Sequence, residues 1–454
     1  MKKYDMIVIG TGCGSIVSSE AVEHGLKVAV VDKAPLLGGT CLNLGCIPSK
    51  MLIHTADQIV DIQESGKLGI KAEIKSIDFL SIMERMRSSR EKSQEEIRKG
   101  ITSEEGIDLY RGKAEFVNNY TLKVNEATLS AKKIIIATGS RPLIPPIKGL
   151  NSVDYLTNES LLELKQKPES IVVIGGGYIA VELGHFLAAM GTKVIMLEMA
   201  DRLILSEEPE ISELLKKSLR KRMEVHTGML AEEVQGLNNG ITVIARDLKT
   251  NKVSKYSAQK LLIAVGRKSN ADLLNFQNTE VELNARGFIK VNQYFRTTVK
   301  GIFAVGDSNG LQMFTHVANR QAAIVAENIL HGSRMKMDYN AIPHAIYSYP
   351  QIAAVGLKEV DAKENHEIVV GITKYLDTAM GEAMEEKEGF AKVILDKKTR
   401  KILGFHIIGP RASELIQEVT NAMTSGGNAD EINNGIHIHP ALSELIPVTI
   451  NNAE

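Results

Sequence analysis

The sequence predicts an α/β protein with two Rossmann-like dinucleotide-binding domains followed by a C-terminal α+β domain. A strand, a glycine-rich loop, a helix and a second strand occur in this order twice, near the start and near the middle of the chain. After about residue 336 the pattern changes to alternating apolar strands, such as 391–395 and 402–408. A length of 454 residues also favours two to four domains over a single core.

The first pattern begins with the apolar run 6–9, which is typical of a buried parallel strand. The loop Gly10-Thr11-Gly12-Cys13-Gly14-Ser15 follows, and a helix is expected to about His24. The next strand, 28–31, ends at Asp32, which lies 22 residues after Gly10. A glycine turn at a helix start lets backbone N–H groups approach a pyrophosphate, and an acid at this spacing binds ribose. Serine ends this loop where the usual fingerprint has a third glycine.

The second pattern has the strand 171–174, the loop Gly175-Gly176-Gly177 and a helix over 178–190. The following strand, 194–197, ends at Glu198, which lies 23 residues after the first glycine of the loop. A carboxylate here would bind ribose hydroxyls and repel a 2′-phosphate, so the site should prefer NAD to NADP. Arg202 lies close enough in sequence to keep NADP as an alternative.

Further features support a duplicated build and mark its limits. Residues 134–139 (IIIATG) resemble residues 261–266 (LLIAVG), and each segment follows its own glycine loop. The proline-rich stretch 141–146 is a natural boundary between the two halves. The charged segment 78–101 has helical periodicity and predicts an exposed helix pair inserted in the first domain.

Composition argues against several classes of function. The chain has 54 basic and 55 acidic residues and a formal net charge of −1, which gives no electrostatic basis for binding nucleic acid or an anionic membrane. No stretch approaches the roughly 18–20 apolar residues of a membrane helix. The apolar run 6–9 is shorter than the roughly 7–15 residues of a secretory signal. We therefore expect a cytoplasmic protein that binds neither nucleic acid nor a membrane.

Cys41 and Cys46 form a close pair in a chain with only three cysteines. Five residues rise about 7.5 Å in a regular helix, whereas a disulfide needs a Cα separation of roughly 4.4–6.8 Å. A bridge therefore requires a distorted turn, which Gly45 and Pro48 permit. A zinc site would need four ligands, and two inert thiols would leave this spacing unexplained. The pair is interpreted as redox-active, while Cys13 is interpreted as a small residue of the first glycine loop.

Four segments carry a resemblance to a known family. Residues 39–50 (GTCLNLGCIPSK) resemble the active-site motif of the pyridine nucleotide–disulfide oxidoreductases, in the group of dihydrolipoamide dehydrogenase and glutathione reductase. Residues 297–307 resemble the family's second flavin motif, and residues 343–356 the start of its dimerisation domain. Residues 439–444 (HPALSE) resemble its C-terminal catalytic motif. The resemblance covers essentially the whole chain.

The resemblance implies two cofactors, FAD and NAD, and a homodimer. The implied division of the chain is an FAD-binding domain in two parts, 1–147 and 269–336, an NAD-binding domain over 148–268 and a dimerisation domain over 337–454. The substrate would be a small dithiol or disulfide, such as a protein-bound lipoyl group. No metal site is expected.

The resemblance also implies roles for particular side chains. Cys46 would lie nearer the flavin and form the charge-transfer thiolate, while Cys41 would exchange with the substrate. His439, contributed by the partner subunit, would be the acid–base, and Glu444 would orient it. These roles are chemically reasonable, since a thiolate is the nucleophile and a base must remove the thiol proton. His437, two residues earlier, is interpreted as structural.

The implied cofactor contacts complete the site. Lys50 and Glu182 would pair near the flavin ring, and Asp307 would contact the ribityl–pyrophosphate region. The residues expected to bind the two cofactors are Gly10, Gly12, Gly14, Asp32, Lys33, Gly39, Thr40, Lys50, Ala114, Thr138, Gly139, Gly306, Asp307, Phe314, Thr315, His316, Gly175, Gly177, Tyr178, Ile179, Glu182, Glu198 and Gly266.

Three hypotheses for the function remain open. The first is oxidation of a dithiol such as dihydrolipoamide with NAD, which Glu198 favours. The second is an NAD(P)H-dependent reductase of a low-molecular-weight disulfide, since residues 10–15, 316–319 and 439–442 resemble mycothione reductases. The third is a flavoprotein scaffold without activity, against which the intact cysteine pair argues. The chain lacks the extra C-terminal cysteines of mercuric reductases, and soluble transhydrogenases lack the redox pair.

Overall fold

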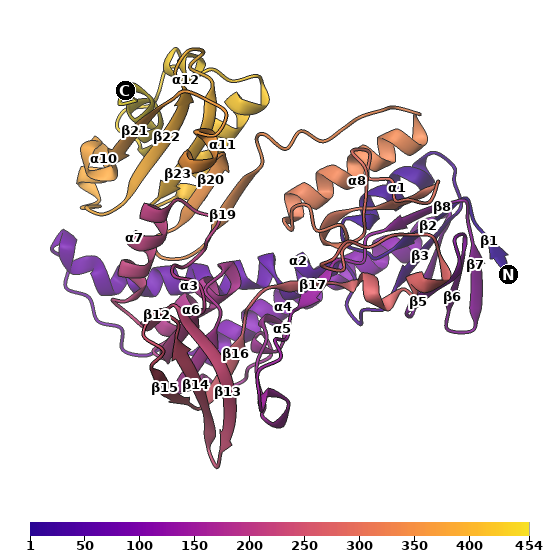
Figure 1. The fold of residues 1–454 in the computed structure, drawn as a ribbon, viewed down its shortest axis with the longest axis horizontal. Coiled ribbons are helices and arrows are strands. Elements are labelled where there is room, and N and C mark those ends of the chain that lie inside the picture. The colour runs from indigo at the N-terminus through magenta and orange to yellow at the C-terminus, as the bar shows by residue number, and fades with distance from the viewer. Residues whose placement is uncertain (454) are drawn as a thin grey trace. The chain divides into compact units, whose positions relative to one another are not determined.

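The computed structural model describes residues 1–453, which form two compact units, each described here by itself (Figure 1). Unit 1 contains residues 1–49, 84–143 and 266–338, and unit 2 contains 50–83, 144–265 and the chain from Tyr339 onward. The helices α3 (Cys46–Glu64) and α4 (Phe79–Ser103) each run from one unit into the other. The α/β fold class is confirmed, whereas the predicted domain boundaries stay predictions.

Unit 1 is built on a parallel sheet with the strand order β18-β8-β2-β3-β4. Its strands are β18 (Ile302–Ala304), β8 (Lys133–Ile136), β2 (Met6–Ile9), β3 (Val28–Asp32) and β4 (Ile107–Arg111). Met6 and Val8 pack into one core cluster with residues of α1 (Gly14–Glu23) and α8 (Thr315–Leu330). Ile7 and Ile9 pack on the other face. The run 6–9 is uniformly apolar because the strand is buried on both faces.

A mixed sheet, in which β1 pairs with β7 in parallel and the other strands are antiparallel, covers that other face of the parallel sheet. It has the order β1-β7-β6-β5, with β1 (Lys2–Lys3), β7 (Ala127–Ser130), β6 (Thr121–Val124) and β5 (Ala114–Asn118). Phe116, Leu122 and Leu129 of this sheet are buried in the same cluster as Ile7 and Ile9. The short strands β9 (Ser140–Pro142) and β17 (Arg267–Ser269) pair with each other at the edge of the unit.

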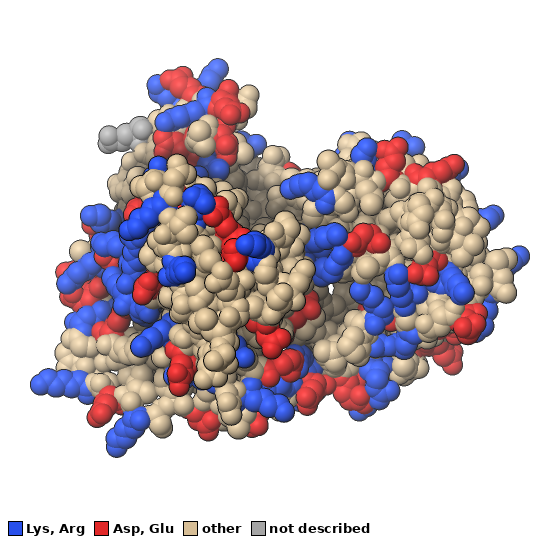
Figure 2. Space-filling model, turned by 60° about the horizontal axis from the view of Figure 1, so that its bottom comes forward, with Lys and Arg blue, Asp and Glu red and all other residues tan. Residues whose placement is uncertain are grey.

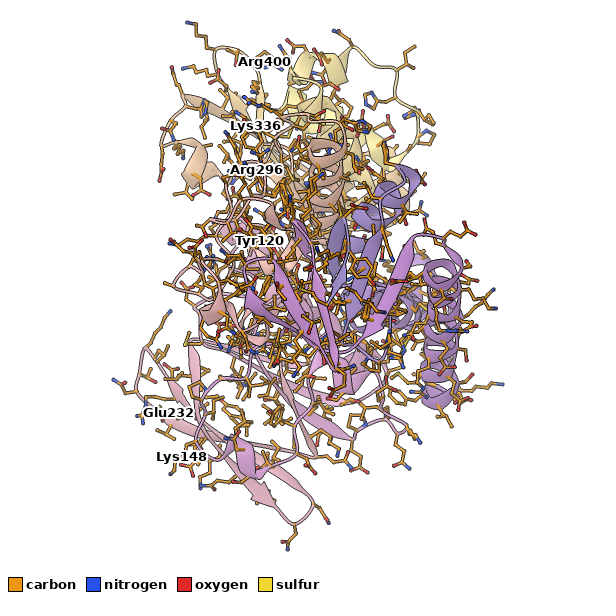
Figure 3. All side chains as sticks on the ribbon, turned by 90° about the vertical axis from the view of Figure 1, so that its right-hand side faces the viewer. Tyr120, Lys148, Glu232, Arg296, Lys336 and Arg400 are labelled. Carbon is orange, nitrogen blue, oxygen red and sulfur yellow. The ribbon has the colours of Figure 1, made fainter. Side chains whose placement is uncertain are left out.

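The first part of unit 2 repeats this architecture. A parallel sheet has the order β12-β11-β10-β16, with β12 (Glu224–Thr227), β11 (Lys193–Glu198), β10 (Ser170–Ile174) and β16 (Lys260–Ile263). An antiparallel sheet follows, with β13 (Met229–Leu237), β14 (Gly240–Asp247) and β15 (Val253–Ala258). The helices are α5 (Asn158–Leu161), α6 (Tyr178–Ala189) and α7 (Pro209–Leu219). Lys148 lies beside the interior of β13, where its backbone N–H donates to Glu232 O at 3.3 Å; both residues are labelled in Figure 3.

The duplication extends to single hydrogen bonds. Gly10 N donates to the end of β3 at Val31 O (2.8 Å), and Gly175 N donates to the end of β11 at Leu197 O (2.9 Å). A Cβ on Gly10 would lie 2.3 Å from Ala137 O, and a Cβ on Gly175 would lie 2.3 Å from Ala264 O. Each glycine also has a positive φ, so both positions require glycine for the same two reasons.

The last part of unit 2 is an antiparallel sheet with the order β19-β20-β23-β22-β21. Its strands are β19 (Pro343–Ile346), β20 (Ile352–Gly356), β23 (Ile402–Ile408), β22 (Phe390–Asp396) and β21 (Ile368–Lys374). Its helices are α9 (Glu359–Ala362), α10 (Ala379–Ala383), α11 (Ala412–Thr424), α12 (Ala429–Asn433) and α13 (Leu445–Asn451). Residues of α11 and α13 share a buried core cluster with one face of the sheet. The predicted α+β character of this region is confirmed.

One predicted element is wrong. The segment 78–101 is not an exposed helix pair but a single 25-residue helix, α4, and Met83, Met86 and Arg90 on it are buried. Its many charges and low apolar content hid the buried stripe from the sequence pattern.

The distribution of charge and the length of the apolar helices agree with the composition. Acidic and basic residues are interspersed over the visible face in Figure 2, as nearly balanced charges lead one to expect. Among residues 1–453, no helix is both long and apolar enough to cross a membrane.

Candidate active site

The cysteine pair lies across a break between two helices. Cys41 is in α2 (Gly39–Leu44), and Cys46 begins α3. Between them Gly45 has φ −141° and ψ −111°, which is not helical. This is the distorted turn that the spacing predicts, because a continuous helix would hold the two Cα atoms too far apart for a bridge. Cys41 is half-buried and Cys46 is exposed.

The start of α2 packs directly against the first glycine loop. Gly39 has φ +74°, and a Cβ on it would lie 2.7 Å from the Cα of Gly12. Only glycine permits this approach. The cysteine motif, which starts at Gly39 and Thr40, therefore begins beside the loop that is expected to hold a pyrophosphate.

Cys46 also lies close to the start of α8. Its Sγ is 3.4 Å from the hydroxyl oxygen of Thr315, the first residue of that helix. The rings of Phe314 and His316, on either side, stack with their centroids 5.5 Å apart. These three predicted cofactor residues are thus grouped at the exposed cysteine. The positive end of the α3 dipole favours negative charge at Cys46, where that helix begins.

The first glycine loop has the features of a dinucleotide site. Gly10 and Gly14 leave no room for a side chain. A Cβ on Gly10 would lie 2.3 Å from Ala137 O, and a Cβ on Gly14 would lie 2.8 Å from Val8. A Cβ on Gly12 would meet only the Gly39 Cα, at 3.6 Å. Across the sheet edge, the Thr138 hydroxyl is buried and has no hydrogen-bond partner among the described residues. A buried hydroxyl costs free energy unless it is bonded, so Thr138 fits a polar group of a bound cofactor such as FAD.

Asp32 is already engaged within the protein. Its Oδ2 accepts hydrogen bonds from the backbone N–H and the hydroxyl of Thr11, at 2.9 and 2.5 Å, and its Oδ1 accepts from Ala34 N at 2.8 Å. A carboxylate has about four acceptor positions, so capacity for a ribose hydroxyl remains. Lys33 is exposed just after β3, and Ala114 is buried at the start of β5.

Asp307 is another predicted cofactor residue of unit 1. It lies in the turn Gly306–Ser308, where its Oδ2 accepts a hydrogen bond from the Ser140 hydroxyl at 2.5 Å.

Burial, and secondarily the Asp307 carboxylate, raise the pKa of the Cys13 thiol to about 12. Cys13 therefore stays protonated at neutral pH, as expected of a packing residue rather than a nucleophile. Gly139 follows Thr138 with φ +66°.

The second glycine loop is the nicotinamide candidate. A Cβ on Gly177 would meet nothing within 4 Å, so the backbone here is open to a ligand at the start of α6, where Tyr178 and Ile179 follow. Glu198, at the end of β11, accepts a hydrogen bond from Ala200 N at 2.7 Å through Oε1. Its Oε2 lies beside Gly176. Gly266, another predicted cofactor residue, has φ +133° and begins the last segment of unit 1, and its role in cofactor binding stays a prediction.

Lys50 and Glu182 form the pair that the resemblance implies. The Lys50 ammonium contacts both carboxylate oxygens of Glu182, at 2.9 and 2.7 Å. Glu182 is only 6% exposed and also accepts a hydrogen bond from Tyr347 N at 3.0 Å. The Tyr347 ring lies 4.5 Å from the ammonium nitrogen. Burial with these partners keeps both charges fixed in place.

His439 and Glu444 are also in contact. The ring Nδ1 lies 2.8 Å from Glu444 Oε1, and Oε2 accepts from Ala441 N at 2.9 Å. The Ala441 N–H and His439 hold the pKa of Glu444 below its usual range. A carboxylate at Nδ1 fixes the tautomer in which Nε2 can accept a proton. The imidazole is 71% exposed, whereas His437 pairs with Glu418 at 2.8 Å.

The predicted residues thus divide between the two units. The cysteines, the first loop, Asp307 and residues 314–316 lie in unit 1. The second glycine loop, Glu198 and the Lys50–Glu182 and His439–Glu444 pairs lie in unit 2. Sequence reasoning missed two residues. Tyr347 stands two positions before the Tyr349-Pro350 motif, and Asn43 stands between the two cysteines. This closeness to a motif was the sequence feature that could have identified them.

Comparisons with known proteins agree on the family. The family description "Pyridine nucleotide-disulphide oxidoreductase" matches residues 4–322, and its dimerisation domain matches residues 342–449. The chain is 37% identical to a dihydrolipoyl dehydrogenase of Bacillus subtilis, over 97% of this chain and 94% of the relative. It is 34% identical to the mycothione reductase of Mycobacterium tuberculosis, over 98% of each.

A solved structure extends the agreement to three dimensions. The HOCl-induced flavoprotein disulfide reductase RclA of Escherichia coli, as its Cu(II) complex, superposes with a TM-score of 0.89 at 27% identity, over 99% of each chain. The resemblance of the motifs, the twofold glycine-loop architecture and these matches lead to one conclusion. This chain belongs to the pyridine nucleotide–disulfide oxidoreductases, a family of FAD-containing enzymes that use NAD(H) or NADP(H).

Proposed function

We propose that this protein oxidises a small dithiol, dihydrolipoamide in the first place, to its disulfide while NAD is reduced to NADH. The observation that carries the proposal is the Cys41–Cys46 turn, with Cys46 exposed at the start of a helix. The relative from Bacillus subtilis supports the choice of dithiol. Glu198 supports NAD over NADP, since its carboxylate would repel a 2′-phosphate.

The proposed reaction starts from the Cys41–Cys46 disulfide. One substrate thiolate attacks the Cys41 sulfur, so the bond to Cys46 breaks and a mixed disulfide forms. The second substrate thiolate then attacks its own linked sulfur, which closes the substrate disulfide and leaves both cysteines reduced. FAD, which the first glycine loop, Thr138 and Asp307 would hold, would supply the two-electron chemistry between the reduced cysteines and NAD. The sum is dithiol plus NAD⁺ giving disulfide, NADH and one proton.

Proton transfer is assigned to His439. Its Nε2 would take the thiol protons, and Glu444 at Nδ1 would stabilise the imidazolium. Because this histidine is strongly exposed in one chain, we propose that it serves the cysteines of a second copy. The dimerisation-domain match supports a homodimer. The apolar residues Ile436 and Ile438, which are 102% and 77% exposed, would be covered in it.

Steady-state turnover of dihydrolipoamide with NAD and with NADP tests the proposal. Wild-type enzyme without NAD-linked turnover of dihydrolipoamide would refute it. His439→Gln is expected to lower kcat by about 10²–10⁴, the usual contribution of a general acid–base. His437→Gln is the matched control, since His437 is a nearby histidine held by Glu418, and it should retain activity.

A second candidate is an NAD(P)H-dependent reductase of a low-molecular-weight disulfide. The mycothione reductase relative, which matches over 98% of both chains, favours it. A panel of disulfides assayed with NADH and NADPH separates the two candidates. A disulfide reductase should reduce one of these disulfides faster than it oxidises dihydrolipoamide. We place either activity in the cytoplasm, where a cysteine pair can cycle between its two states.

A further inference from the structure

A buried amide lies inside the cysteine turn. Asn43 stands between Cys41 and Cys46 and is only 2% exposed. Its Nδ2 donates to Leu37 O at 2.7 Å and to Gly39 O at 3.0 Å. These two acceptors flank the start of α2, so one side chain ties the end of the helix back to its beginning.

The amide oxygen is held from outside the turn. Gln94 Nε2 donates to Asn43 Oδ1 at 2.5 Å, and the Arg90 guanidinium donates to the Asn43 backbone carbonyl at 3.5 Å. Both donors come from α4, four residues apart and therefore on one helix face. Arg90 is itself buried, at 8% exposure. Ile97 lies on the same face of α4, and its Cδ1 would lie 2.7 Å from a Cβ on Gly38, the N-cap residue of α2.

The turn needs such support because α2 cannot hold its own shape. It has only six residues, its N-cap Gly38 has φ +95°, and no side chain caps it. Helices shorter than about 12 residues are marginal on their own. A buried amide also destabilises the fold if its hydrogen bonds are lost. The hydrogen bonds of Asn43 thus hold the turn in shape, and they also offset the cost of burying the Asn43 amide.

We propose that Asn43, held by Gln94 and Arg90 of α4, is a positioning residue that keeps the Cys41–Cys46 turn in the geometry that favours the disulfide. It acts through the turn and touches neither substrate nor cofactor. This inference rests on the redox role proposed for the two cysteines. It predicts that loosening the turn makes the disulfide easier to reduce, because the two thiols then spend less time within bonding reach.

The test is the thiol–disulfide equilibrium of the purified full chain with its flavin, in buffers of reduced and oxidised dithiothreitol. The dithiol reduces the protein disulfide: the bond between the cysteine sulfurs breaks, a disulfide forms within dithiothreitol, and two electrons and two protons pass to the cysteines. Alkylation of the thiols followed by mass spectrometry gives the oxidised fraction.

Gln94→Leu and Asn43→Ala are each expected to shift this equilibrium about tenfold toward the dithiol, which corresponds to about 30 mV. Gln58→Leu is the matched control, because Gln58 is exposed on α3, and it should leave the equilibrium unchanged. The double variant should shift the equilibrium no further than Asn43→Ala alone, since both changes remove one hydrogen-bond chain.

The outcomes are distinguishable. Wild-type equilibria in both variants, or additive shifts in the double variant, would overturn the positioning role while leaving the redox function intact. A wild-type chain that forms no Cys41–Cys46 disulfide would overturn the proposed function and this inference with it. If Asn43→Ala does not fold, Gln94→Leu decides the matter, because it leaves every residue of the turn unchanged.

Discussion

Lys392→Met should destabilise the protein strongly, because this lysine is buried among carboxylates. Lys392 lies on β22 and is 2% exposed. Its ammonium lies 3.1 Å from Glu208, 2.5 Å from Glu210 and 2.7 Å from Glu359. The three acids are the one group of possible metal ligands among the described residues, and the lysine already compensates them. Although burial alone would lower the pKa of Lys392, hydrogen bonds to Glu210 and Glu359 raise it.

The size of the effect follows from which charges stay buried. The Glu210 and Glu359 side chains are 39% and 29% exposed and can turn toward water, whereas Glu208 is 3% exposed and cannot. Removing one partner of a buried pair costs about 3–5 kcal/mol. With two of the three acids able to rehydrate, we expect about 3 kcal/mol, the lower end. Methionine keeps the apolar stem, so little of this loss comes from packing.

Urea unfolding followed by circular dichroism measures the loss. With a slope of about 3 kcal/mol/M, the midpoint should fall by about 1 M. Lys397→Met is the matched control, because Lys397 pairs with Glu367 on the surface, where the side chains are 58% and 75% exposed. It should leave the midpoint nearly unchanged. Equal midpoints for the two variants would refute the reasoning that burial makes the Lys392 cluster costly to break.

Three further predictions concern the site. Glu444→Gln should move the acid limb of the pH–rate profile to lower pH, because His439 loses the carboxylate that favours its protonated form; an unshifted profile would contradict the contact's role. Cys41→Ser should retain long-wavelength flavin–thiolate absorbance and Cys46→Ser should lose it, so equal spectra would contradict the assigned roles of the two cysteines. Glu198→Ser should reduce the preference for NAD over NADP in kcat/KM, and an unchanged ratio would show that other residues set it.

Much of the site was accessible from local patterns. The glycine loops, the cysteine spacing and the His439–Glu444 motif each lie within a few residues of sequence. The structure places His439 and Glu444 in contact and interrupts the helix between Cys41 and Cys46. Lys50 and Glu182 are 132 residues apart and were paired only through the resemblance, which the contacts now match. The helix α4 was misjudged because its buried apolar residues, such as Met83 and Met86, are few among many charges, and Arg90 is buried on it as well.

What the sequence by itself determined is the sheet-forming segments, the two glycine loops and the broken helix at the cysteine pair, because strand burial, positive φ and cysteine spacing leave local signatures. Only the tertiary structure decided the role of Asn43, whose partner Gln94 is 51 residues away, and the burial of Lys392, 184 residues from Glu208. An asparagine or a lysine is ordinarily a solvated residue. Whether it is buried and bonded depends on chain segments that meet only after folding, and no local pattern records that meeting.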